Sequence, residues 1–173
     1  MKKLCLLGLL IIIGATTLSA QEKENIAQPK HAVGLAAGFS TGYGLSYRYW
    51  PDKYGLQVTT APFFSNDEYH ISLGVTGLYK LRSAKYYNFY MYYSNHFLFE
   101  KSPTYYSYIG SNDYNIVEYD RDFTWITGAG PGFEIIAWGR LGFNGMFGLA
   151  YYHRDKSDWQ VSMTIESGIF FKL

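Results

Sequence analysis

The chain has 173 residues, with 15 basic and 14 acidic side chains and a formal net charge of +1. This balance gives no electrostatic reason to expect nucleic acid as a partner, and a single cysteine excludes a disulfide scaffold. Aromatic residues make up 20% of the chain and include 18 tyrosines, which favour surfaces where an apolar environment meets water.

The first twenty residues have the pattern of a secretory signal peptide. Two lysines precede an apolar run that ends at Gly14, and a small-residue cleavage site follows at Ala20. The run is too short to be a membrane-spanning helix. We therefore expect export, cleavage after Ala20 and loss of Cys5 with the signal. Residues 21–30 are expected to form a flexible lead-in to one domain over residues 31–173.

The rest of the chain alternates apolar and polar residues with a period of two, as side chains do along a β-strand. The alternation predicts eight strands, over residues 31–39, 43–50, 54–64, 69–81, 86–99, 123–138, 141–152 and 159–173. The third is the weakest of these, because Pro62 cannot donate to a sheet ladder. Residues 100–122 are predicted to form a long irregular loop.

The polar face of these strands predicts which side of the sheet points inward. It is rich in glycine and alanine and poor in charge, which suits the cramped interior of a small barrel better than a water-facing surface. The apolar face is therefore expected to point outward into hydrocarbon. Charges left inside should pair with one another, because an unpaired buried charge is costly. The interior network is predicted to consist of Arg48, Lys80, Glu134 and Glu166.

Apart from the first connection, a short turn over residues 40–42, the connections alternate between short turns and longer loops. This is the pattern of an all-β, eight-stranded antiparallel up-and-down transmembrane β-barrel with both ends in the periplasm. With the terminal strand over residues 168–173, this pattern resembles small eight-stranded outer-membrane proteins, such as the transmembrane domain of OmpA and the OmpX type. The family usually ends in Phe, where this chain has Leu173. The resemblance implies the outer membrane of a Gram-negative bacterium and contact with lipid and lipopolysaccharide. It also implies recognition of the C-terminal strand by the barrel-insertion machinery.

Two histidines and a serine are candidates for chemistry on the polar face. His70 and Ser72 form a His-x-Ser sequence similar to that of outer-membrane lipid A deacylases, in which a histidine activates a serine. Here Leu73 follows the serine where that family usually has Asn, so we interpret both residues as lumen lining. A tight turn over residues 82–85 would place His70 opposite His96, or one diagonal step from it, as a polar pair. Two imidazoles rarely suffice for a metal, so neither a metal nor a cofactor is expected.

Three further features of the sequence bear on function. Gly128, Gly130 and Gly132 superficially resemble a phosphate-binding loop, but their spacing follows one strand face, where small residues give neighbours room. Glu134 is interpreted as half of an ion pair rather than a general acid. The tyrosines of the predicted loop are candidates for contact with the exterior. These are Tyr105, Tyr106, Tyr108, Tyr114 and Tyr119.

The sequence thus favours a monomeric, non-enzymatic surface or envelope-integrity protein without a wide, porin-like channel. Two alternatives stay open. One is a lipid-modifying enzyme that uses His70 and Ser72, and the other is a soluble periplasmic, lipocalin-like carrier whose apolar face points inward.

Overall fold

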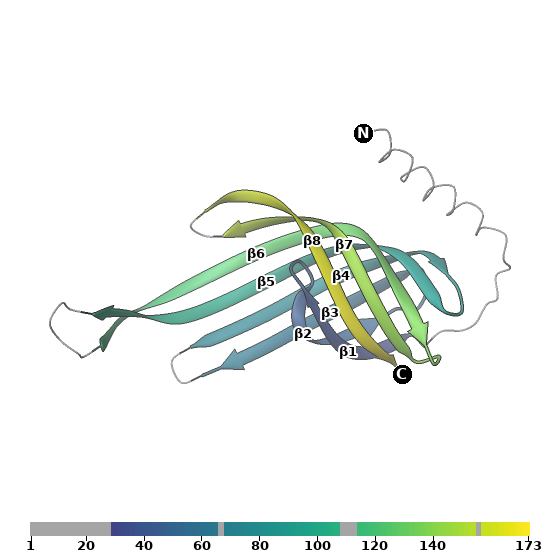
Figure 1. Ribbon diagram of the computed structural model, residues 1–173, viewed down its shortest axis with the longest axis horizontal. Helices are drawn as coiled ribbons and strands as arrows, with labels where there is room; N and C mark the ends of the chain where they lie inside the picture. Colours follow the sequence, from purple (N-terminus) through teal and green to yellow (C-terminus); the bar gives the residue numbers. More distant parts are fainter. Residues whose placement is uncertain (1–28, 66–67, 108–113, 155–156) are drawn as a thin grey trace, which may run out of the picture.

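A computed structural model describes residues 29–65, 68–107, 114–154 and 157–173. These form a closed barrel in which each strand pairs antiparallel with the next and β8 pairs with β1 (Figure 1). The strands are β1 (His31–Gly38), β2 (Gly42–Tyr49), β3 (Tyr54–Phe64), β4 (Tyr69–Ser83), β5 (Tyr87–Ser107), β6 (Tyr114–Ala137), β7 (Leu141–Arg154) and β8 (Ser157–Lys172). The predicted all-β, eight-stranded fold is confirmed. No helix among the described residues is long and apolar enough to cross a bilayer.

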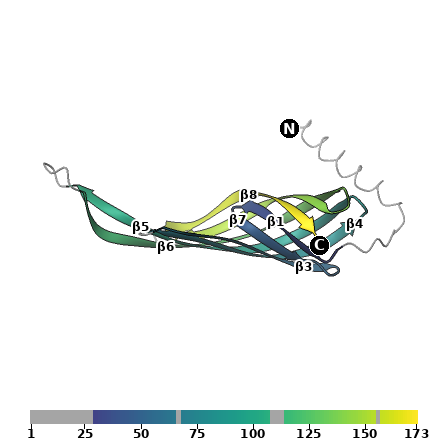
Figure 2. The same cartoon turned by 90° about the horizontal axis from the view of Figure 1, so that it is seen from below.

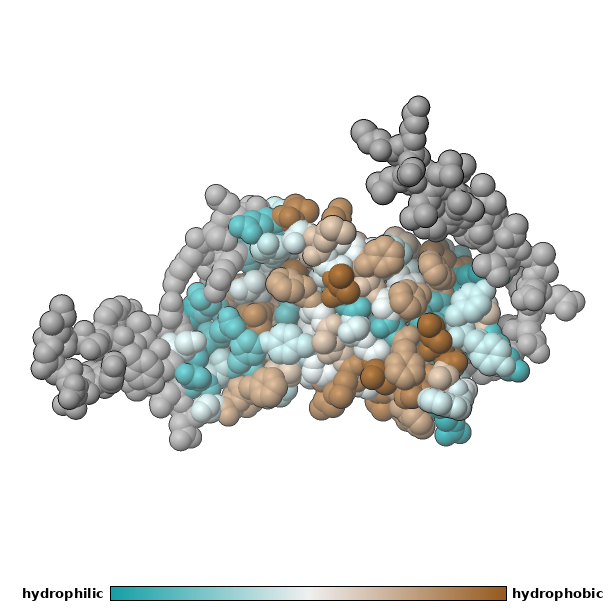
Figure 3. Space-filling model, in the orientation of Figure 1, coloured by the Kyte–Doolittle hydropathy of each residue, from teal (hydrophilic) through white to brown (hydrophobic). Residues whose placement is uncertain are grey.

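The apolar face of the wall points outward, as the alternation predicted. Leu45 is 68% exposed and Ile165 is 81% exposed, and Val75 and Phe143 are also exposed rather than gathered in a core. Apolar side chains cover the middle of the face seen in Figure 3, with hydrophilic ones toward its two ends. The interior is closed by buried side chains, of which Arg48, Tyr90, Phe170, Met146 and Gln57 are the largest.

The two ends of the barrel differ. One end, which we call the short-turn end, carries the β2–β3, β4–β5 and β6–β7 turns. The last of these is tight, with positive φ at Trp138 and Gly139 and a bond from Arg140 N to Ala137 O of 3.3 Å. Two successive positive φ angles suit the right-handed twist of the paired strands. From the other end, which we call the hairpin end, β5 and β6 project far beyond their neighbours (Figures 1 and 2).

The predicted loop over residues 100–122 is wrong, because β5 continues to Ser107 and β6 begins at Tyr114. Thr, Ile, Val and Tyr residues favour strands and sustain the ladder between these two strands. β4 stops pairing with β5 at Lys101, so the outer part of β5 has β6 as its neighbour. Pro103 therefore occupies an edge, where its missing N–H interrupts no second ladder.

Pro62 is accommodated in the same way. β3 is continuous, with Pro62 opposite Ile71 of β4, but its pairing with β2 ends at Thr60. The missing N–H therefore costs no bond to β2. The strand predicted to be the weakest is intact because its proline lies beyond the last pair of the β2–β3 ladder, Leu45 with Thr60.

Candidate functional site in the barrel interior

Glu134 is the centre of an ion-pair cluster at the short-turn end. Its carboxylate lies 3.1 Å from Arg48 Nη1 and 2.8 Å from Lys172 Nζ, and it accepts a 2.6 Å bond from Asn88 Nδ2. Glu134 and Arg48 are only 1% and 2% exposed. Sequence alternation predicts that these two charges share the interior, and the structure places them in contact.

The remaining donors of Arg48 are also used. Nε and Nη2 both donate to Gln57 Oε1, at 3.1 and 2.7 Å, and the guanidinium carbon lies 4.0 Å from the centre of the Phe170 ring. Tyr90 packs beside this cluster, and a Cβ at Gly132 would lie 2.4 Å from its ring. The small residue at Gly132 thus gives Tyr90 the room to fill the barrel.

Lys80 does not take the role predicted for it. Its Nζ lies 4.7 Å from the centre of the Trp50 ring, and among the described residues it forms no ion pair with Glu134 or Glu166. Lys172 supplies the second cation to Glu134 instead. Lys172 is the last residue of β8 and pairs with Ala32 of β1. Closure of the barrel between these two strands places it near Glu134.

Glu166 also departs from the predicted network, because it binds a turn and not a cation. Its carboxylate accepts bonds from the backbone N–H groups of Ser40 and Thr41, at 3.0 and 3.2 Å. The hydroxyls of the same two residues donate to it at 2.6 and 2.5 Å, and Thr164 Oγ1 donates at 2.6 Å. Five donors thus replace the water that a buried carboxylate loses.

The β1–β2 connection is therefore folded into the barrel, and we call Ser40–Thr41 the inserted turn. Both residues are almost fully buried, although the sequence predicts an ordinary short turn there. Facing residues are glycines: a Cβ at Gly74 would lie 1.8 Å from Thr41 O, and one at Gly128 would lie 2.3 Å from Ser40 Oγ. Gly42, with φ of +76°, returns the chain to β2.

The register between β4 and β5 changes the predicted histidine pair. His70 pairs with Glu100, and His96 pairs with Gly74. His70 Nδ1 lies 2.8 Å from Glu100 Oε1. The prediction that His70 faces His96 is wrong, because β4 continues to Ser83 and the turn begins later than the sequence indicates. The ring of Tyr43 lies 5.7 Å from that of His70 and 5.9 Å from that of His96, and its hydroxyl contacts His70 Nε2.

Ser72 bonds to His96 rather than to His70. The distance from Ser72 Oγ to His96 Nε2 is 2.9 Å, and His96 Nδ1 lies 2.8 Å from Phe39 O. A carbonyl only accepts, so Nδ1 carries hydrogen and Nε2 of the neutral ring accepts from the serine. This is the geometry of a serine–base pair, but Ser72 is fully buried behind Tyr43, whose backbone N–H donates to it at 3.2 Å.

The tyrosines predicted for contact with the exterior belong to the β5–β6 hairpin, apart from one. Tyr105 and Tyr106 belong to β5, Tyr114 and Tyr119 belong to β6, and Tyr108 lies outside the described residues. Within the described ranges, no three His, Cys, Asp or Glu side chains gather closely enough to hold a metal ion.

The fold and interior define a closed eight-stranded β-barrel with an apolar outside and a polar, filled inside. It is similar to the N-terminal β-barrel domain of Pseudomonas aeruginosa OprF, at 13% identity over 83% of this chain and 98% of that one, with a TM-score of 0.49. Neisserial surface protein A is 13% identical over 83% of this chain and 94% of that one, with a TM-score of 0.41. Acinetobacter baumannii CarO is 12% identical over 88% of this chain and 100% of that one, with a TM-score of 0.33. No protein-family model and no curated protein matches the chain.

Proposed function

We propose that this protein is an integral β-barrel of the outer membrane of a Gram-negative bacterium, with a non-enzymatic role at the surface or in envelope integrity. The observation that carries the proposal is the distribution of side chains in the barrel. Large apolar side chains cover its outside, while charged and hydroxyl groups fill its inside. In a closed barrel, the backbone N–H and C=O groups of each strand bond to the neighbouring strands. A structure that spans hydrocarbon needs this, because no water is there to bond to these groups.

The orientation follows from the two ends. Barrels of this class keep short turns in the periplasm and longer connections outside. The short-turn end therefore faces the periplasm, and the β5–β6 hairpin extends from the cell surface. The filled interior, with Arg48 and Tyr90 at one level and the inserted turn at another, supports a structural role rather than a wide channel.

Cysteine labelling on whole cells tests this orientation. The sole cysteine of the chain is Cys5, in the segment expected to be removed, so single cysteines can be introduced without background. A membrane-impermeant maleimide should label Ser102→Cys in β5 on intact cells. It should label the matched variant Lys53→Cys, in the β2–β3 turn, only after permeabilisation. The reverse result, or recovery of the chain without detergent, would contradict the proposal.

A lipid-modifying enzyme is the second candidate, favoured by the 2.9 Å contact between Ser72 and His96. Such an enzyme would need substrate to reach a serine that is fully buried in this structure. Mass analysis of lipid A from cells with and without the protein decides the matter, with Ser72→Ala as the matched variant. We expect the three lipid profiles to be the same, and a change that depends on Ser72 would establish the enzyme.

A further inference from the structure

Strand β4 contains a bulge near the short-turn end that redirects one arginine. Lys80 pairs with Tyr90, but the next pair joins Arg82 to Phe89, so Leu81 is an extra residue. Without it, alternation would place Arg82 on the interior face with Lys80. Bulges commonly re-aim a side chain in this way. Here the bulge pairs Arg82 with Phe89 and so places Arg82 on the outer face, together with the exposed apolar residues Leu81 and Phe89.

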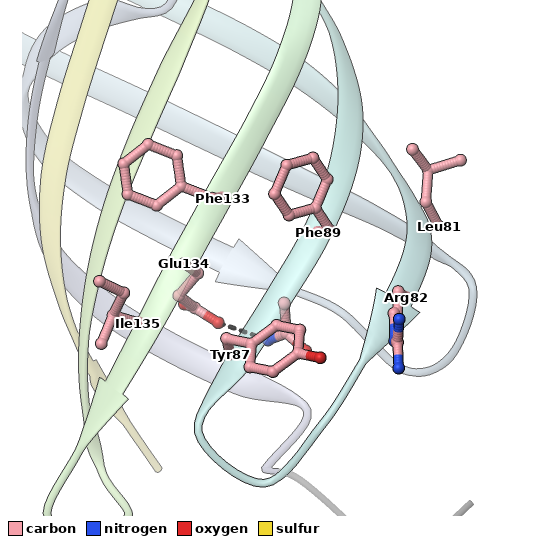
Figure 4. Close-up of a pocket in the computed structure, with 8 residues that line it drawn as sticks. Leu81, Arg82, Tyr87, Phe89, Phe133, Glu134 and Ile135 are labelled. Atoms are coloured by element: carbon pink, nitrogen blue, oxygen red, sulfur yellow. Dashed lines mark hydrogen bonds between the residues drawn. The ribbon is translucent and has the colours of Figure 1, made fainter. Parts of the chain in front are cut away.

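The wall beside Arg82 is hollowed into a groove of about 440 Å³ between β4, β5 and β6. Its apolar sides are exposed residues of all three strands, namely Leu81, Phe89, Phe133 and Ile135. Arg82 and Tyr87 lie at the end of the groove nearer the β4–β5 turn, and Phe89 and Phe133 lie farther from it (Figure 4). Asn88 and Glu134 also line the groove, but their side chains bond to each other in the barrel interior. The exposed side chains of the groove are thus apolar along its length and end in a cation and a phenol.

This surface is complementary to an amphiphile with an acyl chain next to an anionic headgroup. Guanidinium groups bind phosphate through two parallel hydrogen bonds, and the phenol of Tyr87 provides a further donor. Lys85, in the adjacent turn, adds a second positive charge, with its Nζ 5.5 Å from the centre of the Tyr86 ring. Basic side chains at a membrane interface attract lipid headgroups in this way.

We propose that the groove binds one glycerophospholipid, with an acyl chain against Phe89 and Phe133 and its phosphate on Arg82. The site lies near the short-turn end, so the lipid belongs to the leaflet that faces the periplasm. The inference rests on the proposed membrane location of the barrel and names a lipid class for one place on its wall.

Native mass spectrometry of the detergent-extracted full chain tests the site, with phosphatidylglycerol as the probe. We expect one retained lipid per barrel and about tenfold weaker binding in Arg82→Gln, the loss expected for a hydrogen-bonded charge. Lys53→Gln, which removes a cation from another turn at the same end, should bind as the wild type does. Arg82→Lys should fall between them, because it keeps the charge and loses the two-bond geometry.

Two ligand controls on the unmodified protein separate the chain from the headgroup. A diacylglycerol without phosphate should bind about tenfold more weakly, and inorganic phosphate should not displace the lipid. Equal binding of phosphatidylglycerol and diacylglycerol, or unchanged binding in a folded Arg82→Gln barrel, would overturn the inference. Failure of the proposed function would look different, because the chain would then be recovered in solution without detergent and would show no heat-modifiable migration.

Discussion

Among the described residues, each end of the barrel interior buries one carboxylate, and the groups that bind the two carboxylates differ. At the short-turn end Glu134 is held by the cations Arg48 and Lys172, whereas toward the hairpin end Glu166 is held by hydroxyl and amide donors. The first arrangement fixes charged strands to one another, and the second fixes a turn inside the wall. The comparison indicates that charge pairing stabilises the scaffold, while neutral donors close the part of the lumen nearer the hairpin end.

The largest effect is expected from breaking the ion-pair cluster. Arg48→Ala leaves Glu134 with one cation instead of two and Gln57 without its donors, so we expect a loss of about 3–5 kcal/mol in the free energy of unfolding. Urea unfolding of the barrel in lipid vesicles, followed by tryptophan fluorescence, measures it. Arg140→Ala, in an exposed turn, is the matched control and should change the free energy by less than about 0.5 kcal/mol. Equal midpoints for both variants would show that the cluster contributes nothing.

The next largest effect is expected from crowding the inserted turn. Gly74→Ala would place a Cβ 1.8 Å from Thr41 O, and overpacking of this kind costs about 1–3 kcal/mol. Gly77→Ala is a close control, because the nearest atom to a Cβ there is 3.8 Å away. Hydrogen exchange should show that the amides of Ser40 and Thr41 lose protection only in Gly74→Ala. Retained protection with unchanged stability would mean that the turn does not lie against Gly74.

A smaller effect is expected when Glu166 is made neutral. Glu166→Gln offers an amide NH₂ to donors that need an acceptor, so we expect a loss of about 2 kcal/mol and faster exchange at Ser40 and Thr41. Glu134→Gln should cost more, because Arg48 and Lys172 would then be buried without a counter-charge. The reverse order of the two losses would contradict the distinction between the two ends.

The smallest effect is expected at Lys80, which the sequence assigned to the ion-pair network. Lys80→Met keeps most of the side-chain volume and removes the cation–π contact with Trp50, worth about 0.5–1 kcal/mol. The same unfolding measurement applies. A loss of unfolding free energy as large as that of Arg48→Ala would show that Lys80 is part of the ion-pair cluster.

The wall could be predicted from the sequence because the two-residue period alone decides which face a side chain occupies. Leu45 and Ile165 point outward for that reason, whatever their neighbours are. Partners across strands depend on register, and register depends on where turns begin and where bulges occur. The bulge after Lys80 and the continuation of β4 to Ser83 moved His70 opposite Glu100, which no alternation pattern could indicate.

The hairpin and the inserted turn escaped prediction for related reasons. Pro103 and the glycine- and asparagine-containing segment after Ser107 suggest a loop, but a proline is harmless where β5 has lost β4 as a neighbour. The buried position of Ser40 depends on glycines from other strands, such as Gly128, that meet it only in three dimensions. The pairing of Lys172 with Glu134 does not follow from alternation, because the two residues meet only through closure of the barrel.

That closure also constrains how the molecule can form. Ala32 of β1 pairs with Lys172 of β8. The strand pairing that closes the barrel therefore joins residues separated by nearly the whole described chain. Contacts of such long sequence separation are slow to form, since the entropy of the intervening segment must be lost first. Until then β1 and β8 have unsatisfied edges, and a nascent chain must be kept from pairing those edges with other copies before it assembles.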